Sequence, residues 1–404
     1  MSDIKQHLQQ QLRWHLDQRD PRIENLSDKA LREHASRYLS EQVDDHQQHQ
    51  NLIREVVNEA IGLGPLEPLL HDAEISEIMV NRFDRIFIEK AGCLQDAQIA
   101  FSNEQALRRA IDRIVLPLGR HVDDASPMVD ARLQDGSRVN AVITPLALAG
   151  SCLTIRKFSA KPLTLDDLVK SGSLSAEAAE FLSLSVSCRQ NIIVSGGTGT
   201  GKTTLLNTLS SEIPGTERVI TIEDAAELQL SHDNLISLEA RPKNQEGQGA
   251  VGIRELVINA LRMRPDRLVV GECRGAEALD MLQAMNTGHA GSLSTVHANT
   301  ARDALRRLEV MVLMGGIELP ISAIRQQVAS AVDIIVQIAR LSDGRRVVVS
   351  INEVTGLDGD TLQVATLYER SRATDSLQSC QTPCQFAQHQ SDELQARLMH
   401  CLVG

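Results

Sequence analysis

A glycine-rich segment at residues 196–204 carries the side chains whose types and spacing are best suited to chemistry. It reads GGTGTGKTT and matches the pattern GxxxxGK[ST], with a short apolar run before it and the helical run LLNTLSSEI after it. Glycines let backbone N–H groups approach phosphate oxygens without a β-carbon in the way, and the first turn of a helix supplies further donors. The segment therefore predicts a P-loop that binds a nucleoside triphosphate, rather than a merely flexible loop.

Two side chains of the P-loop have predicted roles of their own. Lys202 reaches the β- and γ-phosphates, and the hydroxyl of Thr203 binds Mg²⁺. We therefore expect ATP as the nucleotide and Mg²⁺ as its metal. The predicted nucleotide-binding residues of the loop are Gly196, Gly197, Thr198, Gly199, Thr200, Gly201, Lys202, Thr203 and Thr204.

Two further apolar runs end in carboxylates, which a P-loop enzyme uses to orient water or Mg²⁺. The run RLVVGE ends in Glu272, with Gly-Glu in place of the usual strand-end Asp. The run RVITIEDAAEL places Glu223 at the end of another strand, beside Asp224 and Glu227. We expect Glu272 to activate the attacking water, and both Glu272 and Glu223 to serve catalysis and metal binding. An ordinary acidic helix cap is the alternative interpretation of the Glu223 cluster.

Two histidines lie in the segment TGHAGSLSTVHAN. His289 is in a turn bounded by glycines, and His297 ends an apolar strand. Their position late in the same predicted sheet favours sensing of the γ-phosphate, with His297 as the catalytic candidate. Ordinary core or surface histidines are the alternative.

The length and composition limit which classes of protein the chain can belong to. A length of 404 residues predicts two or three domains, and 42% hydrophobic with 23% charged residues is typical of globular proteins. The net charge of −12 argues against a surface that binds nucleic-acid phosphates. No apolar run is long enough to cross a bilayer and the N-terminus lacks a signal-peptide pattern, so we expect a soluble cytosolic protein.

The elements that must position these side chains follow from the apolar patterns. Over 174–369 short β-type runs alternate with helical runs, which predicts a parallel sheet covered on both faces. An antiparallel hairpin over 332–355 extends that sheet. Residues 51–160 show hairpin patterns and a capped helix, which predict a smaller mixed α/β domain. The remaining predicted parts are a helical N-terminal extension (1–50), a linker (161–173) and a polar C-terminal tail (370–404).

Taken together, these motifs resemble those of the secretion-superfamily traffic ATPases of type II secretion, type IV pili and type IV secretion. GGTGTGKT matches the family's Walker A motif, RVITIEDAAEL its Asp box, LVVGECRGAEA its atypical Walker B motif and TGHAGSLSTVHAN its His box. Upstream, GLGPLEPLL, EISEIMVN, DARLQDGSRVN and LTIRKF look like the N-terminal domain of the branch serving Tad/Flp pili, the CpaF/TadA-like ATPases. The tetracysteine module typical of type II members is absent from the sequence, which favours the pilus and type IV side.

The resemblance implies a fold and a site. The fold is α/β: a RecA-like P-loop domain, a smaller N-terminal domain and a mobile linker, in a ring of six subunits. Carried over by position, Arg132, Arg138 and Arg156 are candidates to reach the phosphates from the N-terminal domain, because a guanidinium pairs bidentately with phosphate oxygens. Surface arginines are the alternative. The arginines that flank Walker B are candidates to serve a neighbouring subunit's site, and the sequence does not choose among them. They are Arg262, Arg264, Arg267 and Arg274.

The resemblance also implies a function. It predicts a cytoplasmic hexameric motor, peripheral at the inner membrane, that hydrolyses ATP to assemble a Tad/Flp-type pilus through a membrane platform and acts on pilin subunits indirectly. Two rivals stay open. A RecA-like nucleic-acid translocase or helicase shares the sheet, but the acidic balance and scarce aromatics disfavour it. A non-hydrolysing nucleotide switch requires Glu272 to be structural.

Overall fold

The chain divides into two compact units in the computed structural model. They span Met1–Ala160 and Lys161–Gly404, and each has hydrophobic clusters of its own. The residues that the structure describes are 7–8, 10–12, 15, 28–41, 46–90, 92–133, 135–158, 162–241, 248–316, 318–372 and 375–403.

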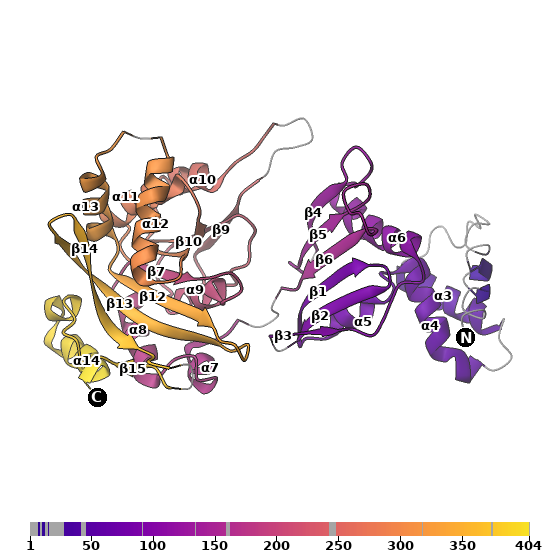
Figure 1. The fold of residues 1–404 in the computed structure, drawn as a ribbon, viewed down its shortest axis with the longest axis horizontal. Coiled ribbons are helices and arrows are strands. Elements are labelled where there is room, and N and C mark those ends of the chain that lie inside the picture. Colours follow the sequence, from indigo (N-terminus) through magenta and orange to yellow (C-terminus); the bar gives the residue numbers. More distant parts are fainter. Residues whose placement is uncertain are drawn as a thin grey trace. The chain divides into compact units, whose positions relative to one another are not determined.

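A six-stranded antiparallel sheet forms the body of the smaller unit, in the order β3-β2-β1-β6-β5-β4 (Figure 1). Its strands alternate as half-buried strands should: in β5, Val139 and Ala141 are buried while Arg138 and Asn140 are exposed. The buried face packs against α6. The strands are β1 Ile75–Arg82, β2 Arg85–Lys90, β3 Cys93–Asp96, β4 Met128–Arg132, β5 Arg138–Val142 and β6 Cys152–Arg156, and the helices are α3 Asp28–Glu41, α4 His46–Ile61, α5 Leu66–His71 and α6 Glu104–Val115, followed by the 3-10 turn Leu116–Leu118.

Helices α3 and α4 form a separate small cluster in this unit. Apolar side chains spaced three and four residues apart meet between the two helices, and Leu8 and Leu12 from the chain before α3 join them. The members from α3 and α4 are Ala35, Leu39, Ile53, Val56 and Val57. Helix α4 runs through the expected boundary between residues 50 and 51. That boundary is wrong, because the polar stretch HQQHQ occupies the first turns of the helix rather than a linker.

A nine-stranded sheet forms the larger unit, in the order β15-β14-β13-β12-β7-β11-β10-β8-β9. The six strands from β12 to β9 are parallel, and β13 to β15 extend the sheet antiparallel. The strands are β7 Ile192–Gly196, β8 Val219–Glu223, β9 Leu235–Glu239, β10 Arg267–Cys273, β11 Leu293–His297, β12 Ile334–Arg340, β13 Arg346–Asp358, β14 Thr361–Glu369 and β15 Gln378–Ser379. The predicted parallel sheet and its appended hairpin are confirmed, and the strand β9 was not predicted.

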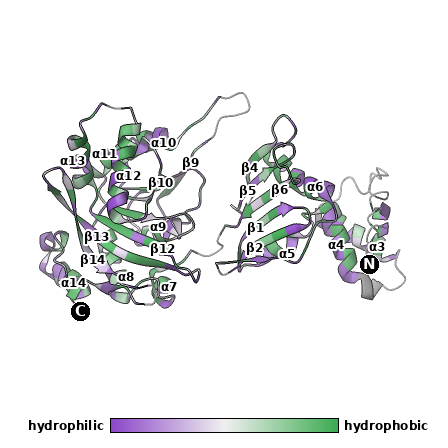
Figure 2. Cartoon of the chain, in the orientation of Figure 1, coloured by the Kyte–Doolittle hydropathy of each residue, from purple (hydrophilic) through white to green (hydrophobic). Residues whose placement is uncertain are grey.

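Two hydrophobic clusters cover the two faces of this sheet. Ile192 and Val194 of β7 belong to one cluster and Ile193 to the other, because successive side chains of a strand point to opposite faces. Helices α7, α8, α9 and α14 pack in the first cluster and α10 to α13 in the second, and these helices carry hydrophilic and hydrophobic residues side by side (Figure 2). The helices are α7 Leu165–Lys170, α8 Ala176–Ser187, α9 Lys202–Ser210, α10 Ile253–Ala260, α11 Glu277–Asn286, α12 Ala301–Met314, α13 Ile321–Ala331 and α14 Asp392–Val403, with a 3-10 turn at Phe386–His389.

The segment expected to be a linker, 161–173, contains a helix instead. Thr164 and Asp167 form a capping box that starts α7. Leu165 and Leu168 are buried in the same cluster as β7. The prediction failed because Pro162 and the Ser/Gly residues that bracket this short helix resemble a linker.

The segment expected to be a polar tail, 370–404, is also part of the fold. Leu398, Cys401 and Leu402 of α14 are buried in the first cluster, and the hydroxyl of Tyr368 donates a hydrogen bond of 2.8 Å to the carbonyl oxygen of Cys401. The spacing of these side chains is helical. The prediction overlooked that period because the residues between them are polar.

None of the helices in the described ranges is long and apolar enough to span a bilayer.

Candidate nucleotide-binding site

The P-loop connects the end of β7 to the start of α9, as the sequence predicts. Thr200 donates a hydrogen bond of 2.9 Å from its hydroxyl to the carbonyl oxygen of Gly197. The ammonium of Lys202 donates to the same carbonyl oxygen over 3.0 Å. The lysine is thus folded back over its own loop, at the N-terminus of a helix where backbone N–H groups and the helix dipole favour an anion.

Glycine is required at two positions of the loop. A β-carbon at Gly196 would stand 2.6 Å from the carbonyl oxygen of Ile338 and 2.6 Å from the hydroxyl of Thr200, closer than real β-carbons approach. Gly201 caps α9 with a φ of 95°, a conformation that other residues adopt only under strain. The loop is therefore shaped by its glycines.

Three of the predicted side chains end neighbouring parallel strands, so they meet at the same edge of the sheet as the P-loop. His297 ends β11 and is paired in register with Gly196 of β7. Glu272 lies near the end of β10, next to β11, and Glu223 ends β8, next to β10. The structure thus brings His297, Glu272 and Glu223 to the carboxyl edge.

His289 does not belong to this group. It precedes β11, in the turn after α11, and therefore lies at the opposite edge of the parallel sheet. The expectation that both histidines sense the γ-phosphate is wrong for His289, because the whole length of β11 separates it from His297.

Glu223 is engaged with its own chain. Its side chain is 3% exposed, and Oε1 accepts hydrogen bonds from the backbone N–H groups of Glu227 and Leu228, over 2.9 and 3.1 Å. A β-carbon at Gly271 would stand 2.9 Å from its Cγ. Glu223 therefore fixes the segment that follows β8, a role the sequence did not predict.

An ion-pair network holds Glu272. Arg274 donates from Nε to Glu272 Oε2 over 2.7 Å, and its Nη1 lies 3.1 Å from Asp224 Oδ2. Partial burial lowers the pKa of Arg274, but the hydrogen bond to Glu272 and the nearby carboxylates leave that pKa above its usual value. The arginine stays charged and links the strand ends of β8 and β10.

The other arginines near Walker B lie away from this edge. Arg262 and Arg264 are exposed and precede β10. Arg267 is wholly buried, with Nε 2.5 Å from Glu217 Oε2 and Nη1 donating to the carbonyl oxygen of Gly291. Of the four candidates for a neighbouring subunit's site, Arg267 is therefore excluded, because its guanidinium is used inside the core.

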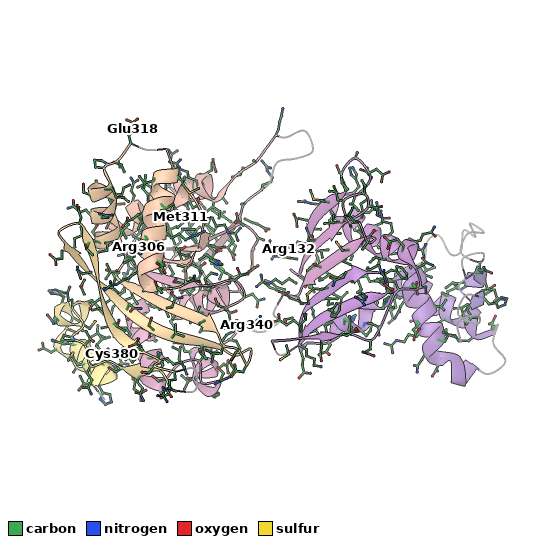
Figure 3. The ribbon with its side chains drawn as sticks, in the orientation of Figure 1. Arg132, Arg306, Met311, Glu318, Arg340 and Cys380 are labelled. Atoms are coloured by element: carbon green, nitrogen blue, oxygen red, sulfur yellow. The ribbon has the colours of Figure 1, made fainter. Side chains whose placement is uncertain are left out.

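The three candidate arginines of the smaller unit form a row across its sheet. Arg132 is paired in register with Arg138, and Arg138 with Arg156, so their side chains share one face. Arg156 lies 3.6 Å from a carboxylate oxygen of Glu77. Arg132, labelled in Figure 3, donates to the carbonyl oxygen of Gly136 over 3.2 Å. The three arginine side chains therefore lie side by side on one face of the sheet.

Two functional candidates escaped the sequence analysis. Arg340 and Arg346 lie at the end of β12 and the start of β13, directly beside the P-loop. The sequence RLSDGRR contains the signal, since an Asp-Gly turn predicts a hairpin that places arginines on its two sides opposite each other.

The fold and the site define a P-loop nucleotide-binding protein with a RecA-like parallel sheet. The model of the family "Type II/IV secretion system protein" matches residues 59–391. The chain belongs to this family, whose members are ATPases that power secretion or pilus assembly.

Individual relatives are similar over most of their length. A putative conjugal transfer protein of Mycobacterium tuberculosis is 39% identical over 326 residues, covering 79% of this chain and 92% of the relative. The type IV secretion system protein PtlH of Bordetella pertussis is 36% identical over 318 residues, covering 72% and 93%. The solved pilus retraction motor PilT with bound ADP shares the fold, with a TM-score of 0.53 and 20% identity over 72% of this chain and 82% of that one.

Proposed function

We propose that this ATPase is the motor of a Tad/Flp-type pilus, working as a ring of six subunits in the cytoplasm against an inner-membrane platform. The observation that carries the proposal is the meeting of the P-loop with Glu272 at one edge of one sheet. The resemblance of the upstream segments to the CpaF/TadA-like branch supports the Tad/Flp assignment.

The residues of the larger unit have distinct tasks in this mechanism. The backbone of the P-loop cradles the phosphates, and Lys202 leaves the carbonyl oxygen of Gly197 to bind them. Glu272, oriented by Arg274, accepts a proton from the attacking water. His297, paired with Gly196, reports the state of the γ-phosphate to β11.

Mg²⁺ fits the oxygen donors at this edge. The hydroxyl of Thr203 and the carboxylate of Glu272 are the ligand types that Mg²⁺ prefers. One oxygen of Glu223 already accepts two backbone hydrogen bonds, so we assign it to support the site rather than to bind the metal. Within the described residues no group of three or more His, Cys, Asp or Glu side chains has the geometry of a metal site. The metal would neutralise charge on the phosphates.

The row of Arg132, Arg138 and Arg156 gives the smaller unit a part in the cycle. We propose that these arginines bind the phosphates once ATP occupies the P-loop, which draws the two units together. Phosphate release then lets the units part. The platform converts this closure into movement of pilin subunits, and the ATPase associates with the membrane through that platform because its net charge of −12 disfavours anionic lipid.

A second candidate is a motor for conjugal transfer or type IV secretion. Relatives that are 36–39% identical support it, since they carry the names conjugal transfer protein and type IV secretion system protein. ATPase stimulation by single-stranded DNA would favour a direct role on nucleic acid, which the acidic balance of the chain disfavours.

Removal of the gene from its host separates these candidates. The Tad/Flp assignment predicts loss of pili with unchanged conjugation and secretion, and recovery by the parent gene but not by K202A. Loss of conjugation or secretion with pili intact would replace the Tad/Flp assignment by the second candidate. Sedimentation of the purified protein with and without ATP tests the ring: a monomer under all conditions would contradict it.

A further inference from the structure

The β12–β13 hairpin brings to the P-loop two arginines that lie outside the four motifs. Arg346 donates a hydrogen bond from Nε to the carbonyl oxygen of Gly199 over 3.0 Å, and its Cδ lies 3.3 Å from the point where a β-carbon on Gly201 would stand. Arg340 has Nη1 3.9 Å from the corresponding point on Gly199 and is labelled in Figure 3. Both guanidinium groups therefore lie against the phosphate-binding loop.

The sheet fixes the position of this hairpin. β12 is paired in parallel with β7, the strand that leads into the P-loop, and Ile338 of β12 is the register partner of Gly196. The carbonyl oxygen of Ile338 lies 2.6 Å from where a β-carbon on Gly196 would stand. The central strands thus hold the arginines beside the loop. Their position does not depend on the conformation of the loop itself.

The register puts the two positive charges directly opposite each other. Arg340 and Arg346 are cross-strand partners, so their side chains share a face of the hairpin. Guanidinium groups suit a polyphosphate because they carry several donors and remain charged.

The neighbouring Arg345 provides a contrast within the same hairpin. Its Nε donates to Asp343 Oδ2 over 2.7 Å, and its backbone N–H donates to Asp343 Oδ1 over 3.0 Å. This arginine stabilises the turn, so its removal changes the charge of the hairpin without touching the P-loop.

We propose that the β12–β13 hairpin is an additional nucleotide-binding element, in which Arg346 positions the P-loop through the Gly199 carbonyl and Arg340 binds a phosphate of ATP. The proposal rests on the binding of ATP at the P-loop. The hairpin belongs to the same unit as the P-loop. Its contribution to ATP binding is therefore independent of the arginine row of the smaller unit.

Nucleotide titrations of matched full-length variants test the proposal. Fluorescent ATP and ADP analogues are titrated into the parent, R340Q, R340K, R345Q and K202A, and ATPase rates are measured over a range of ATP. R340Q is expected to weaken ATP binding about ten-fold and to raise KM more than it lowers kcat, since one charge-assisted contact is lost. R340K keeps the charge and recovers part of the affinity, and R345Q stays within about two-fold of the parent.

Arg346 needs a readout that separates positioning from folding. R346Q is expected to melt within a few degrees of the parent without nucleotide, while the rise in melting temperature on adding ADP falls by at least about half. A variant that melts early but keeps the full rise with ADP would show a purely structural role and overturn the assignment of Arg346.

Two results would overturn the proposal as a whole. One is an unchanged ATP affinity in R340Q, and the other is an equal loss in R340Q and R345Q, which would reflect only the overall charge of the hairpin. Failure of the underlying site is distinguishable, because then the parent itself would bind ATP no better than K202A.

Discussion

At the residue scale, arginines that lie close together in the sequence have different roles in the structure. Arg267 and Arg274 both flank Walker B, yet one is buried against Glu217 and the other holds Glu272 at the carboxyl edge. The sequence presents the two arginines alike. Their roles separate only through burial and partners.

The pair of Arg267 and Glu217 is expected to govern stability rather than turnover. Changing Arg267 to Met leaves the half-exposed Arg189 as the ion-pair partner of Glu217 and removes the donor to the buried carbonyl oxygens of Val186 and Gly291. The free energy of unfolding should therefore fall by about 3–5 kcal/mol. Denaturant unfolding measures the loss. The double change R267M with E217Q should recover most of it, and a double variant as unstable as R267M would contradict the explanation.

At the scale of elements, the C-terminal helix α14 shows how a whole helix completes the hydrophobic core. Its buried side chains complete the cluster on one face of the larger sheet, although its sequence looks like a polar tail. A hydrogen bond links the starts of β7 and β12, since Asp333 accepts it from the backbone N–H of Asn191 over 2.7 Å.

Helix α14 is expected to be required for a stable larger unit. L402A removes a wholly buried side chain and should lower the free energy of unfolding by about 2–5 kcal/mol. M399A, on the exposed face of the same helix, is the matched control and should change it by less than about 1 kcal/mol. Equal effects of the two changes in denaturant unfolding would show that α14 does not pack as described.

Asp333 is expected to make stability depend on pH. Burial raises its pKa to about 6 from the ordinary 3.8. The folded protein therefore binds the proton more tightly than the unfolded chain, and this contribution to stability is lost as pH rises between these values. D333N removes the titration while keeping an acceptor for Asn191, so the variant should be more stable than the parent at pH 7.5 and equal near pH 4. A constant difference across that range would contradict the raised pKa.

The sequence could predict the parallel sheet and the P-loop because both depend on local pattern. Glycines and apolar runs determine where Gly196 and Lys202 lie, and parallel strands bring Glu272 and His297 to one edge. The arginine pair at the P-loop depends on which strand lies beside β7, and the burial of Arg267 depends on long-range packing. The Asp-Gly turn in RLSDGRR predicts the hairpin itself, but neither its place beside β7 nor the burial of Arg267 has a signature within one short segment.

At the scale of the whole molecule, the chain is a member of an ATPase family and consists of two compact units. In the proposed cycle the P-loop unit captures the nucleotide and the arginine row of the smaller unit responds to it. R138Q should then lower kcat at least about ten-fold. Asn140→Ala, on the same face of β5 two positions along, is the matched control, and a rate for R138Q equal to the control would remove the smaller unit from the mechanism.

The central claim is that Lys202 and Glu272 act on the same triphosphate, with one binding it and the other cleaving it. Its most direct test is nucleotide affinity and single-turnover hydrolysis measured side by side for the parent, K202A and E272Q. E272Q is expected to bind ATP within about three-fold of the parent while hydrolysis falls at least about 100-fold, whereas K202A loses the binding itself. An E272Q protein that hydrolyses ATP at the parent rate would contradict the account.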